Sequence, residues 1–257
     1  MSLSSSDRPP TLFANPAGAA WELTIPPRLT SWMKKDHPDQ VRLGEYLDSL
    51  DPLVRPILEA AQGPMVLELT VGLPAADHLL TGGRDLDNFL SPVVHRFGPS
   101  RFVAAIGHKV QSTISTLRLG EATPLDPASL TGWHHSRVTA TVDDTLPAWK
   151  QHIAAAINPD AEELPPGPVE LQISFTGARR KLACGNWHEY WKPTVDALGR
   201  ILGEENPARP YHPKDDRITM LGFHRLIEEV REQLRPVAAG CGEECRCGDA
   251  CGHADDS

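Results

Sequence analysis

Apolar residues occur along the chain in short clusters with two kinds of spacing. Continuous or alternating apolar runs predict strands, whereas apolar positions three and four residues apart predict helices. The predicted strands are 21–25, 65–73, 101–110, 136–142, 169–175 and 218–223. The predicted helices are 40–61, 87–97, 147–157, 187–202 and 225–234. Because both kinds of element occur throughout the chain, the pattern predicts an α+β fold.

The order and length of these elements indicate an internal repeat. The matching segments are 65–73 with 169–175, 85–94 with 186–195, and 101–110 with 216–225. The middle pair aligns without a gap and matches Pro92 with Pro193. Each unit would run strand, helix, strand, loop, helix, strand. The alternative is a coincidence between two unrelated α+β segments.

We expect two such units between a flexible leader and a separate tail. The boundaries are 1–18 for the leader, 19–125 and 126–238 for the units, and 239–257 for the tail. The leader is polar and proline-rich, and it lacks the charged and then apolar order of a signal peptide. No apolar run in the sequence reaches the ~18 residues that a membrane helix needs. We therefore expect a cytoplasmic protein with no membrane partner.

The composition is that of an ordinary soluble protein, with 40% hydrophobic and 23% charged residues. A net charge of −9 argues against a broadly basic surface for nucleic acid. It leaves room for a local basic groove, and Arg179, Arg180 and Lys181 stand together in a predicted loop. Cationic side chains of this kind contact phosphates. The alternative is a solvated loop.

Asp85 and Asp87 stand two residues apart, between a predicted strand and a predicted helix. Asp87 and Asn88 are both good residue types for the N-cap of that helix. Oxygen ligands suit Mg²⁺ and Mn²⁺, so two carboxylates at a strand–helix junction can share one hard cation. The alternative is an N-cap aspartate beside a solvated one.

The stretch 84–88 (RDLDN) is similar to the metal-binding motif of the RusA-type Holliday-junction resolvases. In that family a lysine follows one helical turn later, and an Asp-Asp pair opens the last strand. The second unit of this chain supplies these pieces as Lys192 and as Asp215 and Asp216. The resemblance therefore covers nearly the whole chain, as two degenerate copies of one RusA-like unit.

The resemblance implies a Mg²⁺- or Mn²⁺-dependent endonuclease that cuts branched DNA. It also implies a mixed sheet with helices on one face, and an intrachain pseudo-dimer that acts as a monomer or as a further homodimer. The implied metal ligands are Asp85, Asp87, Asp215 and Asp216. The implied catalytic residues are Asp85, Asp87, Asp216 and Lys192, with the lysine as electrostatic helper. Contacts to DNA would come from Arg84, Arg179, Arg180 and Lys181.

Neither copy carries a complete set of these residues. The first unit has Ser91 in place of the lysine and 100–101 (SR) in place of Asp-Asp. The second has Asn186 and His188 in place of the first two carboxylates. The motifs could converge across the units into one composite site, or His188 and Glu189 could form an altered site. The third outcome is a degenerate binding module, for nucleic acid or a protein partner.

The tail contains a separate cluster of potential metal ligands. Four thiols and one imidazole occur within thirteen residues: Cys241, Cys245, Cys247, Cys251 and His253. Tetrahedral Zn²⁺ requires four sulfur or nitrogen ligands, so this set is sufficient for one ion. Glycines between the cysteines would let the backbone wrap around a metal. The alternative is a flexible, redox-sensitive tail.

Overall fold

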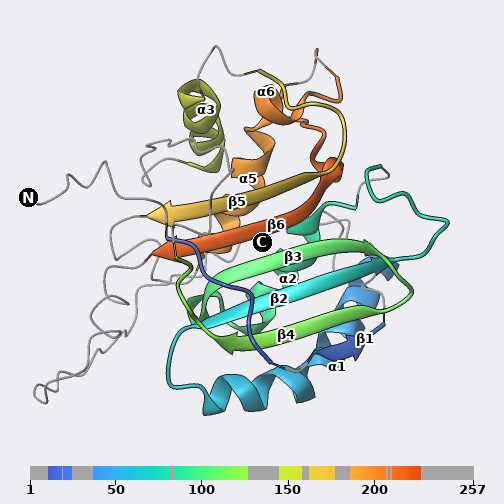
Figure 1. Ribbon diagram of the computed structural model, residues 1–257, viewed down its shortest axis with the longest axis vertical. Helices are drawn as coiled ribbons and strands as arrows, with labels where there is room; N and C mark the ends of the chain where they lie inside the picture. The colour runs from blue at the N-terminus through green and yellow to red at the C-terminus, as the bar shows by residue number, and fades with distance from the viewer. Residues whose placement is uncertain are drawn as a thin grey trace, which may run out of the picture.

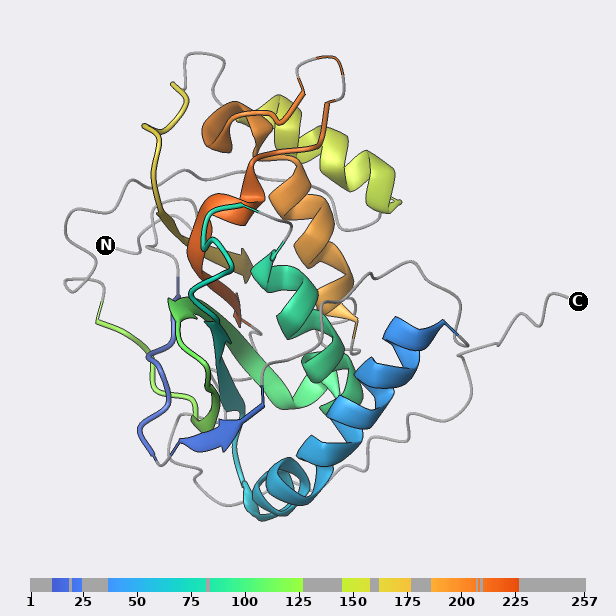
Figure 2. The same cartoon turned by 90° about the vertical axis from the view of Figure 1, so that its right-hand side faces the viewer.

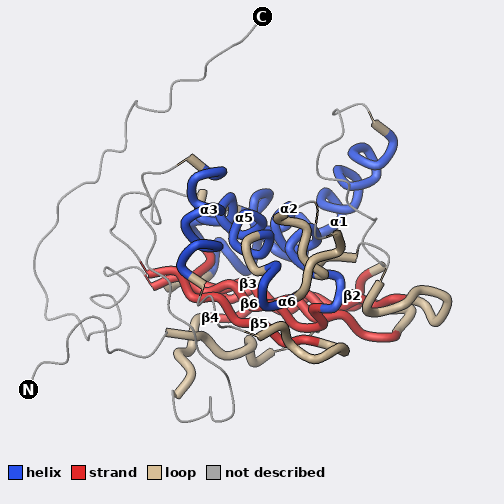
Figure 3. The backbone as a smooth tube through the Cα atoms, turned by 90° about the horizontal axis from the view of Figure 1, so that it is seen from above, coloured by secondary structure: helices blue, strands red, loops and turns tan. Residues whose placement is uncertain are grey.

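The computed structural model of the chain describes residues 11–18, 20–24, 37–81, 84–126, 145–157, 162–176, 186–206, 208 and 210–226. These residues form a mixed six-stranded sheet with a layer of helices on one face, as Figure 1 and Figure 3 show. The strands are β1 (Trp21–Leu23), β2 (Met65–Leu73), β3 (Phe102–Gln111), β4 (Ser115–Glu121), β5 (Val169–Thr176) and β6 (Ile218–Leu226). The helices are α1 (Pro38–Ala60), α2 (Leu86–Phe97), α3 (Leu146–Ala156), α5 (Trp191–Asp196) and α6 (Gly199–Leu202), and the 3-10 turns are η2 (Pro99–Arg101), η4 (Trp187–Tyr190) and η5 (Asp215–Arg217). The predicted α+β class is confirmed.

The strand order of the sheet is β1-β4-β2-β3-β6-β5. β2 pairs in parallel with β3, and β5 pairs in parallel with β6. In each pair the connection is helical: α2 follows β2, and η4, α5 and α6 follow β5. β3 and β6 pair antiparallel and thereby join the two parallel pairs. Strands from both predicted units therefore lie in one continuous sheet.

The two parallel pairs share an irregularity at their start. In each, the ladder skips one residue of the second strand after its first position. The ladder positions are Met65 with Phe102 and Val66 with Ala104 in one pair, and Val169 with Ile218 and Glu170 with Met220 in the other. Phe102 is thus the positional counterpart of Ile218, one residue away from the sequence match of 101–110 with 216–225. The sequence match pairs Gly107 with Gly222, whereas the ladder register makes His224 the counterpart of His108.

Most predicted elements are present, with slightly different ends. β4 is absent from the predicted elements, although buried Leu117 and Leu119 alternate with more polar, partly exposed residues. The predicted helix 187–202 is divided into η4, α5 and α6. Pro193 lacks an amide donor and lies in the first turn of α5, where a proline is tolerated, so it favours the start of a new helix after η4. The described part of the predicted helix 225–234 is the end of β6. The predicted strand 136–142 lies outside the described residues.

The core lies between the sheet and the helices. Apolar side chains of β2 and β3 pack against α1 and α2, and a cluster of aromatic rings packs beneath α5. Trp191 is fully buried and stacks on Phe223 of β6, with ring centroids 4.3 Å apart. Trp187, also fully buried, meets Trp191 edge-on at 4.7 Å. These rings fix the segment that carries Lys192 against the sheet.

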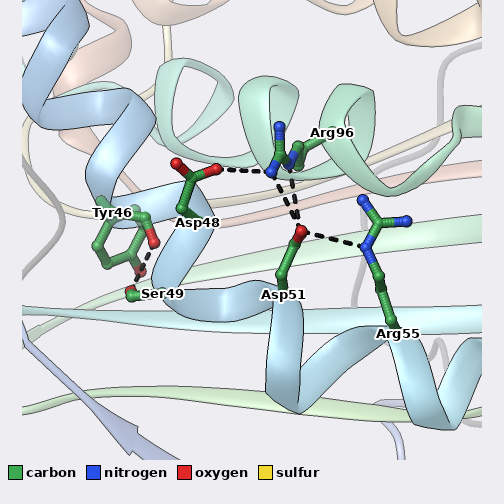
Figure 4. A network of polar contacts seen from close by, with 6 residues as sticks. All are labelled: Tyr46, Asp48, Ser49, Asp51, Arg55 and Arg96. Atoms are coloured by element: carbon green, nitrogen blue, oxygen red, sulfur yellow. Dashed lines mark hydrogen bonds and ion pairs between the residues drawn. The ribbon is translucent and has the colours of Figure 1, made fainter.

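Helices α1, α2, α5 and α3 lie side by side over the sheet, as Figure 2 shows. Arg96 of α2 contacts two carboxylates of α1, Asp48 at 2.6 Å and Asp51 at 3.1 Å (Figure 4). Arg55 reaches the same Asp51 at 3.1 Å. Because exposed ion pairs contribute little to stability, the buried apolar residues hold this layer in place. None of the described helices is long and apolar enough to span a membrane.

Candidate metal centre

Three aspartates from both halves of the chain converge at one edge of the sheet. Asp85 is the N-cap of α2, Asp87 lies in the first turn of α2, and Asp215 opens η5 just before β6. β2 ends where β6 begins, because β3 runs parallel to β2 and antiparallel to β6. One oxygen from each carboxylate lies within 4.8 Å of the other two. Within the described part of the chain, no other group of three or more His, Cys, Asp or Glu side chains comes as close.

These carboxylates are largely shielded from water. Asp87 is 2% exposed and Asp215 is 7% exposed. Asn88 Nδ2 donates to Asp85 Oδ2 at 3.1 Å. Asp85 Oδ1 and Asp87 Oδ2 are buried and accept no hydrogen bond from the described residues, although Lys192 forms an ion pair with Asp87 at 3.9 Å. A buried carboxylate oxygen without a partner is costly, and carboxylate oxygens are the ligands that hard divalent cations prefer. The triad could therefore hold a metal ion.

The same burial makes two of the aspartates weak acids. Desolvation raises the pKa of Asp87 to about 7, partly offset by the positive charge of Lys192. Desolvation, followed by the negative charge of Asp215, raises the pKa of Asp85 to about 6. Both shifts express the cost of gathering negative charge in a poorly hydrated place. A divalent cation would lower both pKa values, so protons and a cation compete for these oxygens.

Lys192 of α5 supplies positive charge next to the triad. Its Nζ lies 2.8 Å from Asp215 Oδ2, 3.1 Å from Asp196 Oδ1 and 3.9 Å from Asp87 Oδ2. Burial alone would lower the pKa of Lys192, but the three carboxylates outweigh burial and raise the pKa above its ordinary value. Asp196 in turn bonds Lys150 Nζ at 2.8 Å. The ammonium is therefore charged, and it is held in place from two sides.

Lys109 is a second lysine at this edge; unlike Lys192 it is fully buried, and it was not predicted from the sequence. It is 3% exposed near the end of β3 and donates from Nζ to the backbone carbonyl of Asp216. Desolvation lowers its pKa, against the opposing charges of Asp85 and the Asp215–Asp216 pair. The available signal is a lysine near the end of the largely apolar run 101–110. The carboxylate of Asp216 lies outside the triad, so its role as a ligand stays a prediction.

The other predicted site residues lie elsewhere or outside the description. Arg84 is half-buried, and its Nη2 donates to Asp77 Oδ2 at 2.8 Å. The predicted contact of Arg84 with DNA stays a prediction. His188 Nε2 lies 3.3 Å from His95 Nδ1. Neither His188 nor Glu189 belongs to a metal-ligating group of three among the described residues. The predicted residues outside the described part of the chain are Arg179, Arg180, Lys181, Cys241, Cys245, Cys247, Cys251 and His253.

Comparison with known proteins identifies no relative of this chain. No protein-family model matches it, and no similar curated protein or solved structure was found. The features that bear on function are therefore the sheet topology, the three carboxylates and the lysine beside them.

Proposed function

We propose that the chain is a RusA-like endonuclease that cuts branched DNA, with Mg²⁺ or Mn²⁺ held at one composite site. The observation that carries this proposal is the meeting of Asp85 and Asp87, from the first unit, with Asp215 and Lys192, from the second. Neither unit has the full set, yet folding brings the carboxylates and the lysine together. A protein without catalysis would gain stability by replacing these buried charges, so their presence favours a working site over a degenerate binding module.

The shared register of the two parallel strand pairs supports an intrachain pseudo-dimer. In that register Lys109 corresponds to Arg225, and Asp216 corresponds to Ser100. Lys109 donates to the carbonyl of Asp216, and Arg225 Nη2 donates to the carbonyl of Ser100 at 2.7 Å. Lys109, near the end of β3, thus donates to the 3-10 turn before β6, and Arg225, near the end of β6, donates to the 3-10 turn before β3. This reciprocal pair is what a two-fold axis between β3 and β6 would produce.

A second pair of equivalent contacts supports the same axis. Arg101 of η2 bonds backbone carbonyls just before β2, with Ala61 O at 3.4 Å. Its counterpart Arg217 of η5 bonds carbonyls just before β5, with Gly167 O at 2.9 Å. Arg101 therefore links the starts of β2 and β3, and Arg217 links the starts of β5 and β6. Two unrelated segments would not be expected to share both pairs of contacts.

The site contains the groups that hydrolysis of a phosphodiester requires. A bound Mg²⁺ or Mn²⁺ would polarise the phosphoryl group and lower the pKa of a water molecule. Asp85, Asp87 and Asp215 would hold the ion, and Lys192 would offset negative charge that develops at the phosphate. In the reaction, the oxygen of water forms a bond to phosphorus and the bond from phosphorus to one sugar oxygen breaks. That sugar oxygen takes up a proton, so the products are a hydroxyl and a phosphate monoester.

The test is cleavage of labelled four-way-junction and flap DNA with Mg²⁺ or Mn²⁺. Asp87→Asn keeps the shape of the side chain and removes the ligand charge, so we expect cleavage to fall by at least ~100-fold. Asp48→Asn is the matched control, because Asp48 lies on α1 with its side chain 66% exposed. Metal-dependent cutting that survives Asp87→Asn would contradict the proposal. Binding of junction DNA without any cutting by the wild-type protein would favour the degenerate binding module instead.

A further inference from the structure

The pseudo-two-fold axis relates the composite site to a second position, between η4 and the C-terminal half of α2. The counterparts follow from the ladder register and from the gap-free match of 85–94 with 186–195. They are Asn186 for Asp85, His188 for Asp87, Ser91 for Lys192 and Pro99 for Asp215. None of these four side chains is a carboxylate or an ammonium.

The strands at this second position nevertheless keep a contact found at the composite site. Arg225 reaches the carbonyl of Ser100, as Lys109 reaches that of Asp216. The same alignment, continued by one residue, makes His95 the counterpart of Asp196. His95 Nδ1 lies 3.3 Å from His188 Nε2, and the ring of His188 packs edge-on against Trp191. The reciprocal contact between the two central strands is kept, while the acidic and basic groups are replaced by an imidazole pair, a hydroxyl, an amide and a proline.

From this asymmetry we infer that the protein has one hydrolytic site per pseudo-dimer and nicks a single strand at each encounter with branched DNA. The inference rests on the proposed function, and it specifies the product of cleavage as a nick in one strand. A hard cation requires several oxygen ligands, and a pair of imidazoles is a poor substitute for carboxylates. A two-fold-symmetric junction would present two equivalent phosphodiesters to the two related positions. Only the one beside Asp87 meets groups that can hold the ion and offset the developing charge.

The number of metal sites tests this inference without any cleavage. Binding of Mn²⁺ to the full-length protein is followed by the electron paramagnetic resonance signal of the free ion. We expect the wild-type protein to bind one more Mn²⁺ than Asp87→Asn. His95→Ala and His188→Asn should both match the wild type. His95 is exposed, so His95→Ala does not alter the packing of the core. His188 is buried, and circular dichroism with thermal melting therefore checks that His188→Asn is folded. Loss of a Mn²⁺ site in either histidine variant would overturn the inference.

The product of cleavage provides the second test. A negatively supercoiled plasmid with an extruded cruciform offers a symmetric four-way junction, and the protein is kept sub-stoichiometric so that two chains rarely act on one plasmid. We expect nicked circles to accumulate first, at the same rate for wild type and His188→Asn. Linear plasmid that forms as fast as nicked plasmid from the earliest time points would show paired incisions and overturn the inference. If the wild type cuts no branched DNA, the proposed function fails, and the Mn²⁺ count still decides between one site and two.

Discussion

Asp87→Asn should stabilise the metal-free protein near neutral pH, although it removes a proposed ligand. Desolvation raises the pKa of Asp87 from its ordinary value of 3.8 to about 7. Between these two pH values the folded state holds a proton that the unfolded state has released, so the free energy of unfolding falls as pH rises, by about 1.4 kcal/mol per unit. Over a window of about three units the loss reaches about 4 kcal/mol. Asparagine stays neutral at every pH and avoids this loss.

Urea unfolding of the metal-free wild type, Asp87→Asn and the control Asp48→Asn measures the effect across pH. The difference between Asp87→Asn and wild type should grow from near zero at about pH 4 to a plateau somewhat above about pH 7, while Asp48→Asn follows the wild type. Excess Mn²⁺ should then stabilise the wild type, by ~2.7 kcal/mol at a concentration one hundred times its Kd, and leave Asp87→Asn unchanged. An Asp87→Asn protein that is no more stable than wild type at about pH 7.5 would refute the reasoning from buried charge.

Three further changes test separate parts of the structure. Lys192→Met should slow cleavage of junction DNA by about 100-fold yet bind Mn²⁺ at least as tightly by calorimetry, because no ammonium then competes for Asp215; wild-type cutting would remove the lysine from the mechanism. Trp191→Ala should lower the free energy of unfolding by about 3–5 kcal/mol in urea, since it opens a cavity against Phe223, and a cost below ~1 kcal/mol would contradict that packing. Deletion of 239–257 should abolish bound Zn²⁺, measured by atomic absorption, and leave cleavage unchanged; Zn²⁺ that persists would refute the predicted tail site.

The sequence alone was sufficient to predict an element where its residue types favour one local structure. The run 65–73 is rich in aliphatic residues, and its prediction as a strand is confirmed with the same ends. The paired carboxylates at 85 and 87 could likewise be recognised as a strand–helix junction. The convergence of Asp215 on that junction could not be deduced from spacing alone, because it depends on the antiparallel pairing of β3 with β6. The place of Lys109 in the site could not be deduced for the same reason, because Lys109 donates to a backbone carbonyl far along the chain.

The asymmetry of the two related positions has a physical rationale of its own. Burial and mutual repulsion raise the pKa values of Asp85 and Asp87, so the metal-free fold bears a cost of several kcal/mol near neutral pH. A second carboxylate cluster would add a cost of the same order, in a protein whose net stability is typically only ~5–15 kcal/mol. His95, His188 and Pro99 place no carboxylate at the second position, so they do not repeat this cost. One complete site in the proposed pseudo-dimer would therefore keep the proposed hydrolytic groups and avoid a second cost of this size to the stability of the fold. It follows that introducing carboxylates with Pro99→Asp and His188→Asp should lower the stability of the metal-free protein, and that added Mn²⁺ should recover part of the loss.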